Sequence, residues 1–249
     1  MDNNSFEKEM RSLEYFHNLR LLPGCWVVIR VDGRGFSRFT QSRFDKPFDL
    51  NFHHLMVQTA QALLTEIQGI YAYTESDEIS VLLPLNWDLF DPSLEKIVSI
   101  SASIASATFT HVSQTIVNFD NRVWLGADKS KVVDYFRWRQ ADATRCALNG
   151  WCYWTLRNKG ESATEATTIL ENKSVAFKNE LLFQNGINFN DLPTWQRRGV
   201  GLYWEDYEKK GYNPIAAKEV IAIRRRIKVD EELPMKEEYS QFIACLLND

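Results

Sequence analysis

Three carboxylates interrupt an apolar, strand-like stretch of the chain, the segment IYAYTESDEISVLLP from Ile70 to Pro84. The β-branched and aromatic residues on either side of them are typical of two short buried strands. Glu75, Asp77 and Glu78 lie between these runs. Because burying an unpaired charge is costly, we expect the acids to occupy a turn where the sheet meets solvent. The segment therefore predicts two neighbouring strands joined by an acidic turn.

A second acidic turn follows another apolar run, GCWVVIRVD, which ends at Asp32 and Gly33. The patterns along the chain then follow the order strand, helix, strand, turn, strand, helix, strand, helix. This order favours an α+β fold with a mainly antiparallel sheet and helices packed on one face. The split βαβ (ferredoxin-like) arrangement is the simplest one that fits. In that arrangement Asp32 and Asp77 reach the same edge of the sheet.

The other patterns divide a single domain of residues 1–249 into a core, about 24–160, and an extension of helices and loops, about 161–249. Helical spacing of apolar residues predicts a helix capped by Asp49, another beyond Pro92, and a long one from Ser130 to Gly160 that is interrupted near Gly150. The segment Asn121–Asp128 predicts a strand. The stretch 33–49 is typical of a loop, and the polar region after about residue 184 is typical of one too.

Composition narrows the class of protein. The formal net charge of −4 argues against non-specific binding of nucleic acid over the whole surface, although WRQADATR, WQRRG and IRRRIK concentrate positive charge locally. The four cysteines lack CxxC spacing and the four histidines lack metal-ligand spacing, which indicates free thiols and structural histidines. The charged amino terminus and the absence of an apolar run of about 18 residues favour a cytoplasmic protein.

Paired acidic turns suit metal-assisted phosphoryl chemistry. Two aspartates on adjacent strands can hold two Mg²⁺ ions about 3.5–4 Å apart, with the carbonyl of Gly33 as a further candidate ligand. The glycines of DGRGF leave backbone N–H groups free to face a phosphate. Taken alone, DGRGF is better explained as an ordinary strand-end turn, and SDE is ambiguous. The combination favours a site, because both acidic turns interrupt apolar strands at compatible ends of one sheet. Lys46, in FDKPFD, is either a triphosphate-neutralising side chain or an exposed loop lysine. No GxxxxGK[ST] or GxSxG motif is present.

Six segments of the chain resemble, in order and spacing, motifs of the tRNA(His) guanylyltransferase family of 3′-to-5′ nucleotide polymerases. They run from about Arg30 to about Pro214 and read RVDGRGFSRFT, FDKPFD, YTESDEIS, DYFRWRQAD, FKNELLF and INFNDLPTWQRRGVGLYWE. The resemblance implies a palm-like catalytic core. It also implies two Mg²⁺ ions held by Asp32, the Gly33 carbonyl and Asp77, with Glu78 as a supporting acid. The residues implied to bind ATP or GTP are Asp32, Gly33, Arg34, Gly35, Phe36, Ser37, Lys46, Ser76, Asp77, Lys178 and Asn179, the last two in the activation step.

The family's reaction takes place at the 5′ end of tRNA. The resemblance implies that a nucleoside triphosphate first caps the 5′-monophosphate. The 3′-hydroxyl of an incoming nucleotide then attacks the activated phosphate. The stretch Thr144–Ala147 replaces the His-Ile-Asn-Asn of enzymes dedicated to histidine tRNA, and Ser37 stands where they often carry histidine. Both changes resemble the bacterial and archaeal guanylyltransferase-like branch, which prefers template-directed addition and repairs truncated tRNA 5′ ends.

We therefore expect a Mg²⁺-dependent nucleotidyltransferase that performs templated addition to the 5′ end and acceptor stem of tRNA. The alternatives are a dedicated tRNA(His) guanylyltransferase that adds G at position −1, a palm-type nucleotide cyclase, and a catalytically inactive tRNA-binding module. The family assembles as tetramers, so the resemblance implies a homotetramer built as a dimer of dimers. Basic candidates for tRNA phosphate contacts are Arg137, Arg139, Arg197, Arg198, Arg224, Arg225 and Arg226.

Overall fold

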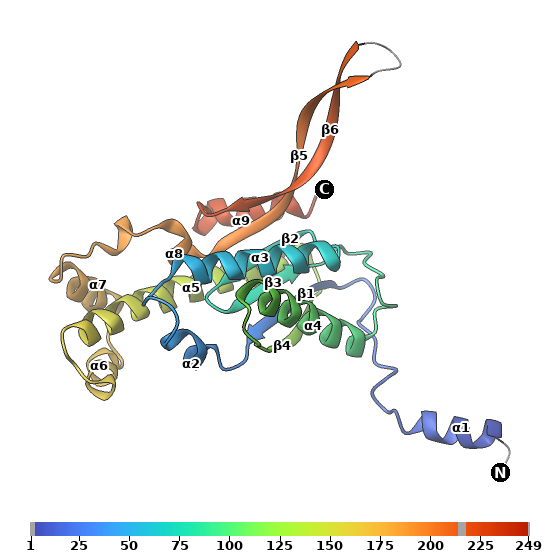
Figure 1. Cartoon of the computed structure of the whole chain (residues 1–249), viewed down its shortest axis with the longest axis horizontal. Helices are drawn as coiled ribbons and strands as arrows, with labels where there is room; N and C mark the ends of the chain where they lie inside the picture. The colour runs from blue at the N-terminus through green and yellow to red at the C-terminus, as the bar shows by residue number, and fades with distance from the viewer. Residues whose placement is uncertain (1–2, 214–217, 249) are drawn as a thin grey trace.

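A six-stranded antiparallel sheet lies at the centre of the computed structural model, which describes residues 3–213 and 218–248 (Figure 1). Its strands are β1 (Trp26–Gly33), β2 (Tyr71–Glu75), β3 (Glu78–Leu82), β4 (Phe119–Gly126), β5 (Val200–Asn213) and β6 (Lys218–Asp230). They are ordered β4-β1-β3-β2-β5-β6. The first four strands thus have the split βαβ order, and the predicted fold class is confirmed.

Helices cover both faces of the sheet. They are α1 (Asn3–Ser12), α2 (Phe36–Gln41), α3 (Leu50–Glu66), α4 (Leu94–Ser113), α5 (Lys129–Asn158), α6 (Ala163–Leu170), α7 (Val175–Phe183), α8 (Thr194–Arg198) and α9 (Lys236–Leu246), with a 3₁₀ turn at Phe189–Asp191. Val27, Ile29 and Val31 of β1 pack with α3 and α4, whereas Trp26 and Val28 pack with α5 and α9. Both alternating sets of β1 are apolar, so the expectation of helices on one face was too narrow.

The core elements follow the sequence pattern closely. Helix α3 begins after Asp49, whose side chain accepts a hydrogen bond from the Phe52 amide at 2.9 Å. Helix α5 continues through Gly150, so the predicted interruption was wrong. A single glycine costs a helix only about 1 kcal/mol relative to alanine, and α5 packs against α6, α7, α8 and α9 along its length. The stretch 33–49 is also not all loop, because α2 buries Phe36 and Thr40 within it.

The region after α7 was predicted to be loop-like, and the structure contradicts this. Strands β5 and β6 form a long hairpin whose outer part stands away from the body of the protein (Figure 1). At its base β5 pairs with β2, from Thr74 opposite Val200 to Tyr71 opposite Tyr203. The many charged residues of the exposed outer part hide the alternating pattern in the sequence. Pro214 lies outside the described residues.

Two further expectations concern the chain as a whole. All four cysteines are free thiols, as their spacing predicted. In the described ranges, no helix combines the length and apolar character that crossing a membrane requires.

Candidate active site

The two acidic turns meet at one edge of the sheet, as the split βαβ topology predicts. In the register of β1 and β3, Asp32 lies opposite Glu78. The Gly33 amide donates a hydrogen bond to the carbonyl oxygen of Asp77 at 3.1 Å. Ser76 adopts the left-handed conformation, with φ of 49°, and so closes the turn between β2 and β3. The turn that carries Asp77 is thereby attached to the end of β1.

The strands place charge at this edge by alternation. On the face covered by α5, β1 presents the buried Trp26 and Val28 and then Arg30 and Asp32. On the same face, β2 and β3 also change from buried residues to acidic ones toward this edge. Strand β2 ends here at Glu75, and β3 begins here at Glu78. Because side chains alternate with period two, the charged residues of three strands gather on one face beside the apolar core.

The electrostatics of Asp77 reflect its position. Burial and the nearby charge of Asp32 raise the pKa of the Asp77 carboxyl, while a hydrogen bond from Ser76 Oγ at 3.0 Å opposes this shift. Two acids held close together in this way suit a hard cation with oxygen ligands. Among the described residues no three His, Cys, Asp or Glu side chains converge on a metal position. The oxygen donors here are therefore two carboxylates and nearby backbone carbonyls.

The DGRGF segment forms a tight connection into α2. A Cβ on Gly33 would lie 2.4 Å from the ring of Phe36, which is packed among four other phenylalanines. Gly35 has φ of 76° and precedes the first turn of α2. The amides of Gly33 and Arg34 donate to the carbonyls of Asp77 and Asn118. Both N–H groups are thus used within the fold, which narrows the predicted phosphate-facing amides to those from Gly35 onward.

Two cavities lie beside the acidic turn. The first, of about 360 Å³, is lined by Phe36, Ser37, Lys46, Ser76 and Asp77 among others. The second, of about 190 Å³, shares Lys46 and Ser76 and continues toward Glu75 and α5. Five of the predicted nucleotide-binding residues therefore surround one cavity.

Lys46 lies between the two cavities. Its Nζ donates a hydrogen bond to Thr40 Oγ1 at 2.6 Å. Burial lowers the pKa of the Lys46 ammonium, although the charges of Asp77 and Asp49 oppose the shift. Lys46 is therefore a half-buried cation beside the acidic turn, and not the exposed loop lysine of the alternative interpretation.

Lys178 and Asn179 lie elsewhere. Both belong to α7, which packs against α5 at the end of the molecule away from the sheet (Figure 1). Neither residue lines the two cavities beside Asp77. The Asn179 side chain donates to the carbonyl of Val175 in its own helix at 2.9 Å. The structure therefore does not bring these two predicted residues to the others.

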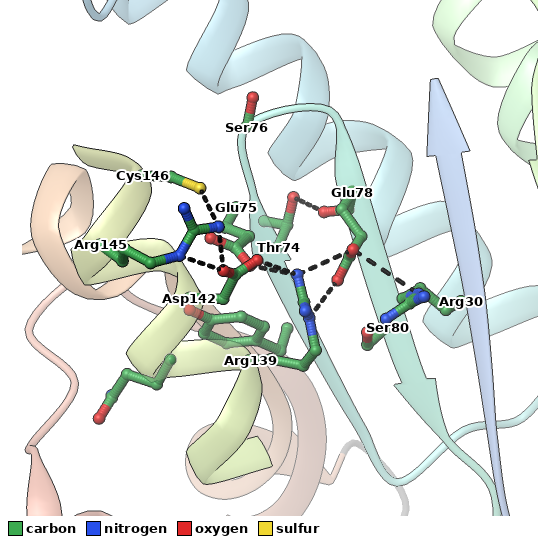
Figure 2. A network of polar contacts seen from close by, with 12 residues as sticks. Arg30, Thr74, Glu75, Ser76, Glu78, Ser80, Arg139, Asp142, Arg145 and Cys146 are labelled. Carbon is green, nitrogen blue, oxygen red and sulfur yellow. Dashed lines mark hydrogen bonds and ion pairs between the residues drawn. The ribbon is translucent and has the colours of Figure 1, made fainter. Parts of the chain in front are cut away.

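A buried ion network connects the acidic turn to α5 (Figure 2). Arg139 Nε and Nη2 donate to the two carboxylate oxygens of Glu78 at 2.7 and 3.0 Å, and Nη2 also reaches Glu75 at 2.8 Å and Asp142 at 3.1 Å. The Arg139 side chain is only 7% exposed. The expectation that Arg139 contacts tRNA phosphates was therefore wrong, because this guanidinium is occupied by three carboxylates.

The network gives Glu75 and Glu78 a role that the sequence did not show. Burial raises the pKa of Glu75 to about 8; the charge of Arg139 opposes this shift, and the charges of Glu78 and Asp142 add to it. Burial alone would lower the pKa of Arg139, but the charges of Glu78 and Glu75 outweigh it and raise that pKa. A signal was present in the sequence, because Arg139 shares a helical face with the buried Phe136 and Ala143.

The other predicted tRNA-contacting arginines fall into two groups. Arg197 Nε and Arg198 Nη1 donate to the carbonyls of Leu192 and Leu233 at 2.8 and 2.9 Å, so both are partly used within the fold. The exposed group consists of Arg137 on α5 and of Arg224, Arg225 and Arg226 on β6.

Comparisons with known proteins agree with this geometry. Residues 7–139 match the family described as tRNAHis guanylyltransferase, and residues 130–242 match the Thg1 C terminal domain. A probable tRNA(His) guanylyltransferase of Mus musculus is 33% identical over 79% of this chain and 72% of its own. The tRNA(His) guanylyltransferase of Schizosaccharomyces pombe is 32% identical over 86% of this chain and 89% of its own.

Solved structures are similar over nearly the whole chain. A bacterial tRNA(His) guanylyltransferase (Thg1)-like protein in complex with GTP aligns with a TM-score of 0.74 and 28% identity, covering 98% of this chain and 99% of that one. A bacterial Thg1-like protein in complex with ATP gives 0.74 and 27%, covering 97% and 99%. The family models together span most of the chain, and the motifs of the acidic edge lie within them. The chain therefore belongs to the tRNAHis guanylyltransferase family.

Proposed function

We propose that this protein is a Mg²⁺-dependent nucleotidyltransferase that adds nucleotides in the 3′-to-5′ direction to the 5′ end of tRNA, using the opposite strand as template. The observation that carries the proposal is that Asp32 and Asp77 meet at one sheet edge, beside a cavity that is lined by Asp77 and Lys46. Family membership and the GTP- and ATP-bound neighbours support tRNA and nucleoside triphosphates as the substrates.

The residues of the edge have distinct parts in this chemistry. Asp32, Asp77 and the Gly33 carbonyl would hold two Mg²⁺ ions, which when bound activate a hydroxyl and stabilise charge on the leaving group. Lys46 contributes a positive charge for triphosphate oxygens. Arg139 binds both oxygens of Glu78 and so fixes the acid that follows Asp77. Nucleotidyl transfer of this kind relies mainly on positioning and electrostatics.

The reaction runs in two transfers. In the first, the tRNA 5′-phosphate attacks the α-phosphate of ATP or GTP, which forms a 5′–5′ linkage and releases pyrophosphate. In the second, the 3′-hydroxyl of an incoming nucleotide attacks the activated 5′-phosphate, and the nucleoside monophosphate leaves. Neither transfer needs a covalent intermediate on the protein.

The template-directed form is supported by two sequence departures that lie at the cavities. Ser37, which replaces a frequent histidine, lines the larger cavity. Cys146 and Ala147, within the Thr144–Ala147 stretch, line the smaller one. Thr144 itself donates to the carbonyls of Gln140 and Arg197 and so is used within the fold. The side chains that differ from those of dedicated enzymes thus border the space beside Asp77.

The test uses a tRNA that lacks its first 5′ nucleotide and carries a 5′-triphosphate, so that one base of the opposite strand is unpaired. Each of the four nucleoside triphosphates is supplied in turn, for each identity of that unpaired template base, and extension is measured. We expect addition of the complementary nucleotide for every template base, and loss of activity in Asp77→Ala. Preferential addition of G to full-length histidine tRNA, whether adenosine or cytidine stands at position 73, would instead identify a dedicated guanylyltransferase. A folded protein that adds nothing to either RNA would refute the proposal.

Two further parts of the proposal concern the setting. We infer a homotetramer, as in the family, with the tRNA surface extending over more than one subunit. We also infer a cytoplasmic location, for which the four free thiols are suited.

A further inference from the structure

A third opening lies near the end of β1, on the face of the sheet that α5 covers. It has a volume of about 160 Å³ and is lined by Arg30, Arg122, Val123, Trp124, Tyr135 and Trp138. Arg30 lies two residues before Asp32 on the same strand and face, so their Cα atoms are roughly 7 Å apart. Arg122 of β4 lies directly opposite Arg30. We refer to this opening as the Trp138 cleft.

Trp138 is the unusual residue of the cleft. The indole is 52% exposed, although its neighbours on α5, Tyr135 and Arg139, are buried. The Arg139 guanidinium lies 4.5 Å from the centre of the ring, and the Arg30 guanidinium lies 5.4 Å from it. The Tyr135 ring meets it edge to face at 5.7 Å. Trp138 is therefore an indole that is supported from the protein side and open to solvent on the other.

The support comes from the acidic turn. Glu78 binds Arg139 through two hydrogen bonds and lies 3.6 Å from Arg30 Nε, so one carboxylate positions both guanidinium groups under the indole. Arg122 is held less firmly. Its side chain is 59% exposed, and its nearest carboxylate oxygen, from Asp120, is 3.7 Å away. Its guanidinium is available to an anion in solvent.

We propose that Trp138 stacks on a base at the 5′ end of the RNA substrate and that Arg122 contacts the adjoining phosphate. An exposed, rigidly supported aromatic ring next to arginines is the arrangement by which proteins hold unpaired nucleotides. Successive nucleotides of one strand lie about 3.4 Å apart. Arg30, which lines the cleft, lies roughly 7 Å from Asp32, so a 5′-phosphate held at Asp32 and Asp77 would bring the first or second base within reach of the Trp138 cleft. This inference rests on the proposed function, in that it takes RNA as the substrate.

The experiment measures RNA binding, independently of catalysis. Equilibrium dissociation constants are determined without nucleotide or Mg²⁺, for an acceptor-stem RNA and for versions with one abasic site at each of the first three 5′ positions. We expect Trp138→Ala to bind the intact RNA about tenfold more weakly, which is roughly 1.4 kcal/mol. In the wild type, an abasic site at position one or two should cost a similar factor. In Trp138→Ala that same abasic site should not raise the dissociation constant any further.

Matched variants separate stacking from other effects. Trp138→Phe should retain most of the affinity, and Tyr15→Ala, at an exposed aromatic near the amino terminus, should leave it unchanged. Arg122→Ala should reduce the slope of log affinity against log salt by about one, and Arg11→Ala, at an exposed arginine of α1, should not.

The results of the binding experiment test the stacking of Trp138 separately from the proposed function, which the extension assay tests. An abasic penalty that persists undiminished in a folded Trp138→Ala protein would overturn the stacking assignment, as would a loss of GTP or ATP affinity in place of RNA affinity. Templated extension by the wild type would still stand in either case. If extension fails while the abasic penalty depends on Trp138, the proposed catalysis falls and the RNA site remains.

Discussion

Replacement of Arg139 by methionine tests whether the buried network holds the acidic turn together. Methionine has a similar length and fills the space, but it removes the positive charge that Glu75, Glu78 and Asp142 share. Asp142 keeps a partner in Arg145, at 2.5 Å. Glu75 and Glu78 keep only Arg30, which is 3.6 Å from Glu78. Because the pKa of Glu75 is about 8, this residue is mostly protonated at pH 7, and the variant leaves the nearly buried carboxylate of Glu78 without adequate compensation.

The expected loss is large. Removing one partner of a buried ion pair typically costs about 3–5 kcal/mol, because the remaining charge stays desolvated. For a protein of about 150–250 residues each kcal/mol corresponds to roughly 2–4 °C in Tm. We therefore expect Arg139→Met to lower Tm by about 6–20 °C at pH 7. Burial raises the pKa of Glu78, so a larger fraction of its carboxyl is protonated at pH 5, and the difference from wild type should shrink there.

The assay is thermal unfolding followed by circular dichroism at pH 5 and pH 7, with Arg139→Lys and Arg137→Met as controls. Lysine keeps the charge but not the two-pronged geometry, so its loss should be intermediate. Arg137 is exposed on the same helix, and its replacement should change Tm little. A Tm for Arg139→Met within 2 °C of wild type at pH 7, or a deficit that grows at pH 5, would refute this account of the network.

Three further predictions follow from single residues. The folded-state pKa of Glu75, about 8, lies above its ordinary value, so its stabilising contribution is complete below about pH 4.5 and is lost as pH rises through 8. Glu75→Gln should flatten that loss in urea unfolding between pH 5 and 8, and parallel curves would contradict the assignment. Gly199 has φ of 72°, and a Cβ there would lie 2.5 Å from Tyr73 Oη. Gly199→Ala should therefore lower the free energy of unfolding by more than about 1 kcal/mol. An unchanged unfolding midpoint would show that the junction of β5 and β2 accommodates the added methyl group. Asp49→Ala should cost about 1 kcal/mol through loss of the α3 cap, with Asp49→Ser close to wild type, and equal losses in both would exclude capping.

The parts of the fold that were predicted correctly are those where local pattern and packing agree. Apolar runs of β-branched and aromatic residues in Trp26–Gly33 and on either side of the acidic turn marked β1, β2 and β3. The Asp49 cap marked the start of α3. The β5–β6 hairpin was missed because its outer strands have no core to face, so solvent-exposed charges replace the alternation that marks a half-buried strand.

The site was predictable to the extent that it follows from topology. The meeting of Asp32 and Asp77 depends only on strand order, which the element sequence indicates. The pairing of Arg139 with Glu75 and Glu78 was not predictable in the same way, because it depends on how α5 lies across the sheet. The hydrogen bonds from Arg139 to Glu78 and Glu75 join residues more than sixty positions apart in the sequence. Local sequence carries no signal for it beyond the buried face of α5.

The central claim is that Asp32 and Asp77 together support templated addition to an RNA 5′ end. It is tested most directly by measuring single-turnover addition of a complementary nucleotide to a 5′-triphosphorylated, truncated tRNA over a Mg²⁺ titration, for wild type, Asp32→Asn and Asp77→Asn. We predict a rate that depends on Mg²⁺ in the wild type and that falls by at least about 10³-fold in each variant, with Tm preserved, since each variant removes a carboxylate proposed to hold the metal ions. A folded variant that adds nucleotides at the wild-type rate, with an unchanged Mg²⁺ dependence, would contradict the claim.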